Sequence, residues 1–278
     1  MRLTRLSLSF FIALTVNQSL VFASPLVDQQ QIYAFYQTVF PQLPFKDYAD
    51  GVYAIDADAK TSWLAINEFP PYEFELEEGK ALFQKAFNNG KHYADCFSNE
   101  GIAIAQLYPQ WNIKTQSITT LATAINDCRI VNHAEPLKFA EDEITKITAY
   151  MAYTSRGQKI NTVIPSDPAA LTAYELGKTY FYQRRGQLNF SCASCHVQNA
   201  GKFIRSEILS PALGHTTHWP AYRLKTGKLG SLHRRFIVCN TLIRAPIDKA
   251  QSPALRQLEF FLSNMSNGLT LNGPSVRK

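Results

Sequence analysis

The sequence predicts a mainly α-helical protein built from two domains that are related by an internal repeat. The segments 76–83 and 174–181 share a glycine, a lysine and a phenylalanine at matching positions, and each leads to a glycine and then a cysteine. Further along, Cys128 and Cys239 each precede a glycine by 29 positions. Apolar residues in these stretches recur at helical spacing, and glycine ends them. Weak matches at equal spacing therefore favour a duplicated helical unit.

The most specific motif is Cys192-Ala193-Ser194-Cys195-His196. This spacing attaches a c-type haem, because each thiol adds to a vinyl group and the imidazole binds the iron. A redox dithiol would leave the adjacent histidine unexplained. A zinc site would need a second ligand pair, and the sequence has no second CxxC. Cys192, Cys195 and His196 therefore predict a covalently bound haem c in a cytochrome c-like domain.

The first domain is predicted to be cytochrome c-like but to lack haem. At the position equivalent to the haem motif it has Cys96-Phe97-Ser98-Asn99-Glu100, so the second thiol and the histidine are missing. We therefore expect one haem in the chain. A Cys96–Cys128 disulfide is predicted to stabilise this domain, with two buried free thiols as the alternative. The predicted domains span residues 24–160 and 161–278.

Residues 1–23 are predicted to be a removable secretory signal peptide. Arg2 and Arg5 precede an apolar run that ends in a small residue, Ala23. No later segment is apolar enough to span a membrane. The predicted location is the periplasm, an oxidising compartment in which disulfides persist. Removal of Arg2 and Arg5 with the signal peptide lowers the formal net charge from +6 to +4. This mild basic balance suits an anionic substrate or an acidic partner, but no clustered basic run favours nucleic acid binding.

Cys239 remains after the haem and the disulfide have taken four of the five cysteines. Ser231 is a suitable N-cap for a helix on which Arg235 and Cys239, four residues apart, share one face. A thiolate is a strong ligand for haem iron, and the planar guanidinium group suits a small oxyanion such as a sulfonate. The alternative is a buried, inert cysteine beside a solvated arginine.

Several other residues are candidates for the second iron ligand: His215, His218, His233 and Met265. Each histidine is interpreted first as structural or solvent-exposed, and Met265 as core packing. Ligation by one of them would make the chain a periplasmic monohaem electron-transfer cytochrome without bond-forming activity. This is the alternative to an enzyme. A haem peroxidase is disfavoured, because nothing in the sequence indicates an open iron site.

With these features in place, the sequence resembles the SoxA subunit of the SoxAX cytochrome complex, an L-cysteine S-thiosulfotransferase of bacterial sulfur oxidation. The resemblance covers essentially the whole mature chain and rests on the two repeats, the Cys192 to His196 motif, and Arg235 four residues before Cys239. It implies that His196 and Cys239, the latter modified to a persulfide, bind the iron, and that Arg235 is the active-site arginine. The incomplete motif of the first domain matches members with one haem.

The resemblance further implies the activity and its partners. Thiosulfate would be conjugated to a cysteine thiol of the SoxY carrier protein, in the SoxYZ complex, and electrons would pass through haem to a SoxX-type cytochrome in a heterodimer. Cys239 is the implied catalytic residue, and Arg235 would bind the sulfonate. Lys202, Arg205 and Arg234 would steer anions to this site, although a solvated surface position is the simpler interpretation of each.

Overall fold

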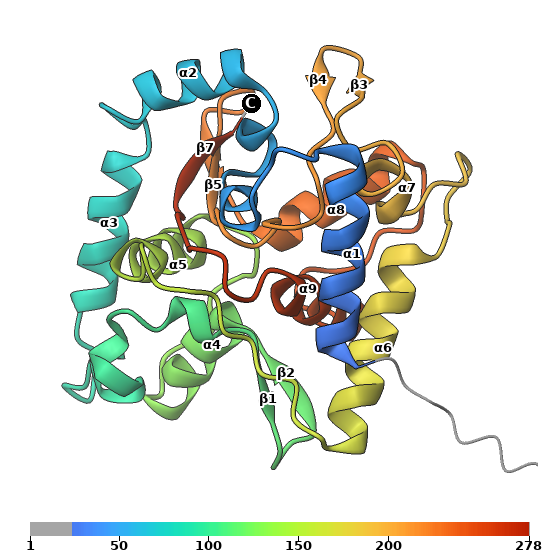
Figure 1. Cartoon of the computed structure of the whole chain (residues 1–278). Helices are drawn as coiled ribbons and strands as arrows, with labels where there is room; N and C mark the ends of the chain where they lie inside the picture. The colour runs from blue at the N-terminus through green and yellow to red at the C-terminus, as the bar shows by residue number, and fades with distance from the viewer. Residues whose placement is uncertain (1–23, 278) are drawn as a thin grey trace, which may run out of the picture.

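A computed structural model describes residues 24–277, and this part of the chain is mainly helical (Figure 1). The predicted signal peptide lies outside the described residues. The α-helices are α1 (Pro25–Val39), α2 (Ala57–Ile66), α3 (Glu73–Gln84), α4 (Leu121–Val131), α5 (Asp142–Thr154), α6 (Pro168–Tyr182), α7 (Cys192–His196), α8 (Leu232–Leu242) and α9 (Pro253–Met265). Connecting 3₁₀ segments are η1 (Phe45–Ala54), η2 (Tyr93–Cys96), η3 (Ser98–Gly101) and η4 (Ala105–Leu107). None of the helices within 24–277 combines the length and apolarity needed to cross a bilayer.

Short strands form two hairpins and one small sheet. The hairpins pair β1 (Gln110–Asn112) with β2 (Ser117–Thr119), and β3 (Phe203–Ile204) with β4 (Glu207–Ile208). In the sheet, the central strand β5 (Ala221–Arg223) is antiparallel to β6 (Lys228–Gly230) and parallel to β7 (Ser275–Arg277). The parallel pairing brings the end of the described chain beside a segment that is distant in sequence.

Two apolar cores organise the fold. Helices α3, α4 and α5 surround the first core, which includes Phe83, Phe87, Tyr93, Leu121, Ile125, Ile144, Ile147 and Met151. Helices α1, α6 and α9 contribute most of the second, which includes Ile32, Tyr36, Tyr174, Phe181, Leu258, Phe260, Phe261 and Met265. Figure 1 shows α3, α4 and α5 on one side of the molecule and α1, α6 and α9 on the other. Because burial of each large apolar side chain contributes roughly 1.5–3 kcal/mol, these two clusters drive folding.

The same close helix crossing occurs in both cores, at the glycine that the repeat shares. A Cβ atom at Gly79 in α3 would overlap the backbone carbonyl of Lys146 in α5. A Cβ atom at Gly177 in α6 would overlap the backbone carbonyl of Gln257 in α9. Since any larger residue would push the helices apart, both crossings require glycine.

Capped helices of the same kind carry one cysteine in each half of the chain. Helices α4 and α8 both have eleven residues and follow an antiparallel strand pair, β1–β2 and β5–β6 respectively. The hydroxyls of Thr120 and Ser231 accept a hydrogen bond from the amide three residues later, at 3.2 Å in each case. Such caps satisfy N–H groups that a first helical turn leaves unpaired. Cys128 and Cys239 therefore occupy the same position, the eighth, in two similarly built helices.

A disulfide joins Cys96 in η2 to Cys128 in α4, with the Cα atoms 5.7 Å apart. Asn99 and Glu100, which replace the end of the haem motif, are exposed in η3 with φ angles of 47° and 53°. Aromatic side chains pack in the adjoining core: Phe83, Phe87 and Tyr93. The segment that the predicted repeat aligns with the haem motif is thus held by a covalent link and adjoins a core of aromatic rings.

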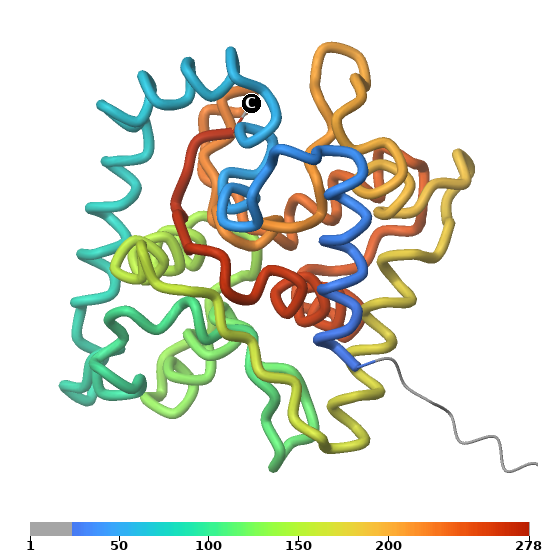
Figure 2. The backbone as a smooth tube through the Cα atoms, viewed as in Figure 1, coloured from blue at the N-terminus to red at the C-terminus, as the bar shows by residue number. Residues whose placement is uncertain are grey.

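The amino-terminal segment packs against the second core, although the sequence placed it in the first domain. The phenol rings of Tyr36 and Tyr48 are fully buried there. Asp28 in α1 forms an ion pair with Lys178 in α6 (Oδ1 to Nζ, 2.7 Å) and accepts a hydrogen bond from the Tyr174 hydroxyl. Figure 2 shows this blue segment lying over the yellow and red parts of the chain. These long-range contacts involve a segment outside the predicted repeat, so the repeat could not be used to predict them.

Candidate active site

One cavity of about 270 Å³ brings together the site residues predicted in the second half of the chain. Its wall includes Cys192, Cys195 and His196 from α7, and Arg235 and Cys239 from α8. Apolar side chains form much of the remaining wall: Phe181, Leu232, Phe236, Ile243, Leu258 and Leu262. Three exposed residues of the β3–β4 hairpin also line it: Ile204, Ser206 and Glu207. The cavity therefore opens to solvent beside that hairpin, and its apolar wall with a few converging polar groups is typical of a ligand site.

A short capped helix presents the two thiols of the motif. Ser191 Oγ accepts from the Ser194 amide at 3.0 Å, and Ser194 Oγ accepts from the Ser191 amide at 3.1 Å. This reciprocal cap fixes the first turn of α7. Burial raises the pKa of the Cys192 thiol to about 12, and the nearby sulfur of Cys239 adds to this effect. Cys192 and Cys195 thus face the same space as the sulfur of Cys239.

His196 is held in the orientation that an iron ligand needs. Its Nδ1 lies 2.9 Å from the backbone carbonyl oxygen of Ser210. Because a carbonyl can only accept, Nδ1 carries the proton and Nε2 keeps a free lone pair. Burial lowers the pKa of His196 to about 4, so the imidazole is neutral at physiological pH. A neutral imidazole with a free Nε2 is the form that binds a metal.

The backbone around His196 is fixed by a buried hydroxyl from the amino-terminal helix. The Tyr36 hydroxyl accepts from the Ala212 amide at 2.7 Å and donates to the carbonyl of His196. The Ala212 amide also donates to that carbonyl, at 3.1 Å. Tyr36 has no exposed surface. The histidine and the loop that orients its ring are therefore joined through one residue of α1.

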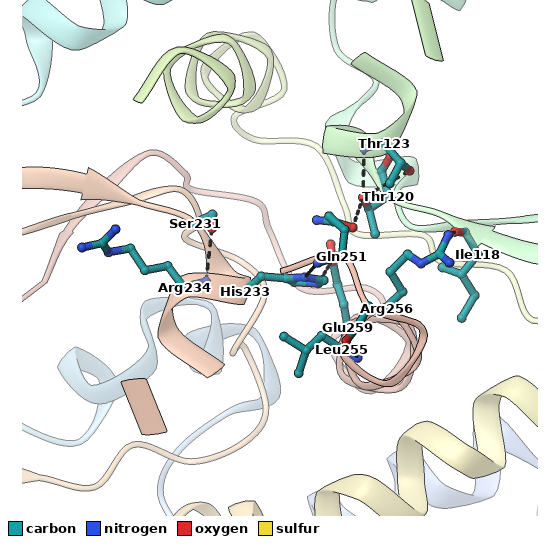
Figure 3. Close-up of polar contacts among 11 residues, drawn as sticks. Ile118, Thr120, Thr123, Ser231, His233, Arg234, Gln251, Leu255, Arg256 and Glu259 are labelled. Carbon is teal, nitrogen blue, oxygen red and sulfur yellow. Dashed lines mark hydrogen bonds and ion pairs between the residues drawn. The ribbon is translucent and has the colours of Figure 1, made fainter. Parts of the chain in front are cut away.

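A polar network anchors the start of α8 (Figure 3). His233 Nδ1 accepts from the Gln251 amide at 2.9 Å, so its proton lies on Nε2, which is 2.8 Å from Glu259 Oε2 in α9. The Gln251 side chain in turn contacts the Thr120 hydroxyl at the start of α4, at 2.8 Å. Figure 3 shows His233 between the Gln251 loop and α9. This network connects the two halves of the chain at the helix that carries Arg235.

The end of α8 is anchored as well. Asn240, next to Cys239, donates from Nδ2 to the Tyr180 hydroxyl at 2.7 Å, and that hydroxyl donates to Asp248 Oδ2 at 2.7 Å. With both ends of α8 bonded to neighbouring elements, the four-residue spacing of Arg235 and Cys239 places both side chains in the cavity wall. The sequence predicted this shared face but not its anchors.

Two of the other candidate histidines also line the cavity. The His215 ring lies edge-on to the His196 ring, with centroids 4.3 Å apart, and its Nε2 lies 3.3 Å from Ser210 Oγ. Burial lowers the pKa of His215 and of His218 well below the usual value for histidine. Both rings are therefore neutral at physiological pH and shape the polar part of the wall.

The remaining sequence candidates lie outside the cavity wall. His233 faces Glu259. Met265 is 1% exposed and packs in the second core, in agreement with its interpretation as a core residue. Lys202, Arg205 and Arg234 are exposed and do not line the cavity.

Sequence reasoning missed three arginines in the cavity wall: Arg185, Arg223 and Arg277. Arg223 and Arg277 are direct partners in the parallel pairing of β5 with β7. The guanidinium group of Arg185 lies over the Tyr180 ring, 3.5 Å from its centroid. Nothing local in the sequence signals these positions, because strand pairing and loop packing create them. Together with Arg235 they place four guanidinium groups in the cavity wall, which also contains the carboxylates of Asp56 and Glu207.

These residues fit a c-type haem. Two thiols with the required spacing adjoin a neutral imidazole with a free nitrogen, and Cys239 adds a sulfur donor to the same cavity. Arg185 Nη1 is buried in this wall without a hydrogen-bond partner within residues 24–277. A buried donor in that state is expected where a bound group supplies the acceptor.

Comparisons with known proteins agree with this chemistry. Residues 78–160 match the family model described as SoxA/TsdA, cytochrome c domain. The chain is 47% identical to the L-cysteine S-thiosulfotransferase subunit SoxA of Chlorobaculum tepidum, over 90% of this chain and 87% of the relative. It is 46% identical to the same subunit of Allochromatium vinosum, over 92% and 91%. The crystal structure of SoxXA from P. pantotrophus matches with a TM-score of 0.72 and 28% identity, over 78% of this chain and 84% of that chain.

Proposed function

Because the chain belongs to the SoxA family of L-cysteine S-thiosulfotransferase subunits, we propose that it conjugates thiosulfate to a cysteine thiol of a SoxY carrier protein. The outer sulfur of thiosulfate forms a bond to the carrier sulfur. One proton leaves the thiol, and two electrons pass to a SoxX-type cytochrome, the partner subunit. The product is a carrier S-thiosulfonate, and no other atoms are gained or lost.

The cofactor of this reaction is a single c-type haem. Cys192 and Cys195 hold it through thioether bonds, and His196 Nε2 and the sulfur of Cys239 are the proposed iron ligands. When bound, the haem supplies an iron centre that accepts electrons one at a time. The Ser210 carbonyl keeps His196 in the tautomer that binds metal.

Cys239 and Arg235 carry out the sulfur chemistry in the proposal. The Cys239 sulfur first forms a bond to the outer sulfur of thiosulfate, with the loss of the thiol proton and two electrons. The carrier thiol then displaces Cys239 at that outer sulfur, and its proton returns to Cys239. The planar Arg235 guanidinium binds the sulfonate oxygens and offsets their charge throughout. The opening beside the β3–β4 hairpin is the proposed entry for the carrier's cysteine.

The observation that carries this proposal is the single cavity shared by the haem motif and the Arg235–Cys239 pair. A cytochrome that only transfers electrons has no need of a free cysteine and a cation in its haem cavity. Met265, one of the alternative iron ligands, is buried in the core away from the cavity. The enzyme is therefore favoured over the electron carrier.

The domain organisation follows from the same proposal. Within residues 24–160, helices α3 to α5 form a cytochrome c-like unit without haem that the Cys96–Cys128 disulfide stabilises. Residues 161–278 form the haem-binding unit, against which the amino-terminal helix α1 packs. Residues 1–23 direct the chain to the periplasm and are removed. The repeated glycine crossings and capped helices support the duplication, and the packed aromatic core beside Cys96 supports the absence of haem in the first unit.

A turnover assay with the partner cytochrome, the carrier and thiosulfate tests the proposal. The purified haem-loaded subunit is compared with Cys239→Ala and Arg235→Ala, and mass spectrometry follows the carrier product. We expect Cys239→Ala to abolish product and Arg235→Ala to lower kcat/KM for thiosulfate by at least tenfold, about 1.4 kcal/mol. Arg234→Ala is the matched control, because it removes the same charge from the exposed side of α8. Full activity of both site variants would refute the enzyme assignment.

A further inference from the structure

The cavity wall contains two arginines in direct register. β5 and β7 are parallel, and Arg223 in β5 is the partner of Arg277 in β7. Partners on neighbouring strands point to the same face of a sheet, about 4.8 Å apart along the hydrogen-bonding direction. Both side chains line the cavity. Since like charges directly opposite one another destabilise a sheet, this arrangement needs an anion to offset it.

Within residues 24–277 no carboxylate forms an ion pair with either arginine, although the charge of Glu207 acts on Arg223 and that of Asp50 acts on Arg277. No carboxylate oxygen lies within 4.0 Å of either guanidinium group in this part of the chain. Arg277 donates from Nη1 to Ser275 Oγ at 2.8 Å and to the Val276 carbonyl at 2.9 Å, and both acceptors are neutral. The Arg277 guanidinium group is thus held in place by neutral acceptors and has no direct ion-pair partner in the described residues.

Arg277 is also strongly desolvated. It is 5% exposed, and its guanidinium carbon lies 4.6 Å from the centroid of the Tyr53 ring and 5.6 Å from that of Trp63. Burial lowers the pKa of Arg277 to about 10, and the charge of Arg223 acts in the same direction. Tyr53 and Asp50 partly oppose this shift, but a buried cation without a direct ion pair is still costly, and it favours binding of an anion at this place.

The pair lies away from the helix that carries the haem motif. In Figure 1, β5 and β7 are on one side of the molecule and α7 is on the other, with the cavity wall reaching both. The carboxylate side chains of a porphyrin leave the ring at the edge opposite its vinyl-derived attachments. A ring attached at Cys192 and Cys195 therefore directs two carboxylates away from α7, towards the part of the wall that is not formed by the motif.

We propose that Arg223 and Arg277 form the binding site for the two carboxylate groups of the covalently attached porphyrin. This inference rests on the proposed attachment of haem at Cys192 and Cys195. Charge-assisted hydrogen bonds from two guanidinium groups would offset the repulsion between them and satisfy both carboxylates. Arg235 then remains free for the substrate sulfonate.

The test uses haem-loaded protein carrying Arg223→Gln, Arg277→Gln, or both, with Arg234→Gln as the matched control for charge. Covalent haem content is measured first. Resonance Raman spectra then report the propionate bending bands, spectroelectrochemistry reports the reduction potential, and the turnover assay reports KM for thiosulfate.

We expect haem content to be retained, the propionate bands to move, and the potential to fall, because loss of a nearby cation disfavours the more negative reduced state. Arg223→Lys is expected to restore part of the potential, and Arg234→Gln to change none of these quantities.

Unchanged propionate bands and potential in both single variants would overturn the inference. A raised KM for thiosulfate with unchanged propionate bands would also overturn it, because the arginine pair would then bind the substrate's sulfonate. If Arg277→Gln fails to fold, the half-buried Arg223 still provides the test. Absence of covalent haem from the parent protein would overturn the proposed function itself, which separates the two failures.

Discussion

Replacing Cys96 and Cys128 together by serine removes a covalent link from the first core. The disulfide joins residues 32 positions apart. Loop-closure entropy for a span of this size predicts that the free energy of unfolding falls by about 4 kcal/mol at 25 °C. For a protein of this length, a change of that size lowers Tm by roughly 10 °C. The effect arises mainly in the unfolded chain, which the bond restricts.

Denaturant unfolding and a thermal scan measure this loss, and the haem absorption spectrum serves as the internal control. We expect the double variant to be less stable but to keep the parent spectrum, because neither cysteine lines the cavity. Treating the parent with a reductant is expected to produce the same loss of stability. A loss below about 1 kcal/mol would contradict the stabilising role of the bond. Loss of the haem spectrum in the folded variant would show that the first core supports the haem site more directly than the packing indicates.

Two further substitutions test the contacts that position the site. Gly177→Ala places a methyl group against the Gln257 carbonyl, so we expect the free energy of unfolding to fall by about 1–3 kcal/mol in denaturant titrations, and an unchanged value would contradict the close crossing. Tyr36→Phe removes one buried hydroxyl that bonds to Ala212 and to His196, so we expect a loss of about 1–3 kcal/mol together with a changed low-temperature EPR spectrum of the haem. An unaltered EPR spectrum would restrict Tyr36 to a purely structural role.

The sequence predicted the parts of the site that depend on local spacing. The haem motif, the Ser231 cap, and the shared helix face of Arg235 and Cys239 each need only a few consecutive residues. The pairing of Cys96 with Cys128 followed from the repeat, because removal of the haem motif left them without another role. Each of these inferences required no knowledge of which segments meet in space.

The unpredicted features depend on contacts between distant segments. No sequence pattern indicated that Tyr36 lies behind His196, because α1 lies outside the predicted repeat. Arg223 and Arg277 become partners only when strands β5 and β7 pair in the folded chain. His233 was a candidate iron ligand, and only the position of Glu259 in α9 shows that its ring faces away from the cavity.

The EPR spectrum of the oxidised haem, compared between the parent and Cys239→Ala, tests the central claim most directly. If the sulfur of Cys239 binds the iron, the parent gives a low-spin spectrum with sulfur ligation, and the variant loses that signature while keeping its covalent haem. Identical spectra from the two proteins would contradict the claim and would leave an electron-transfer cytochrome as the better description.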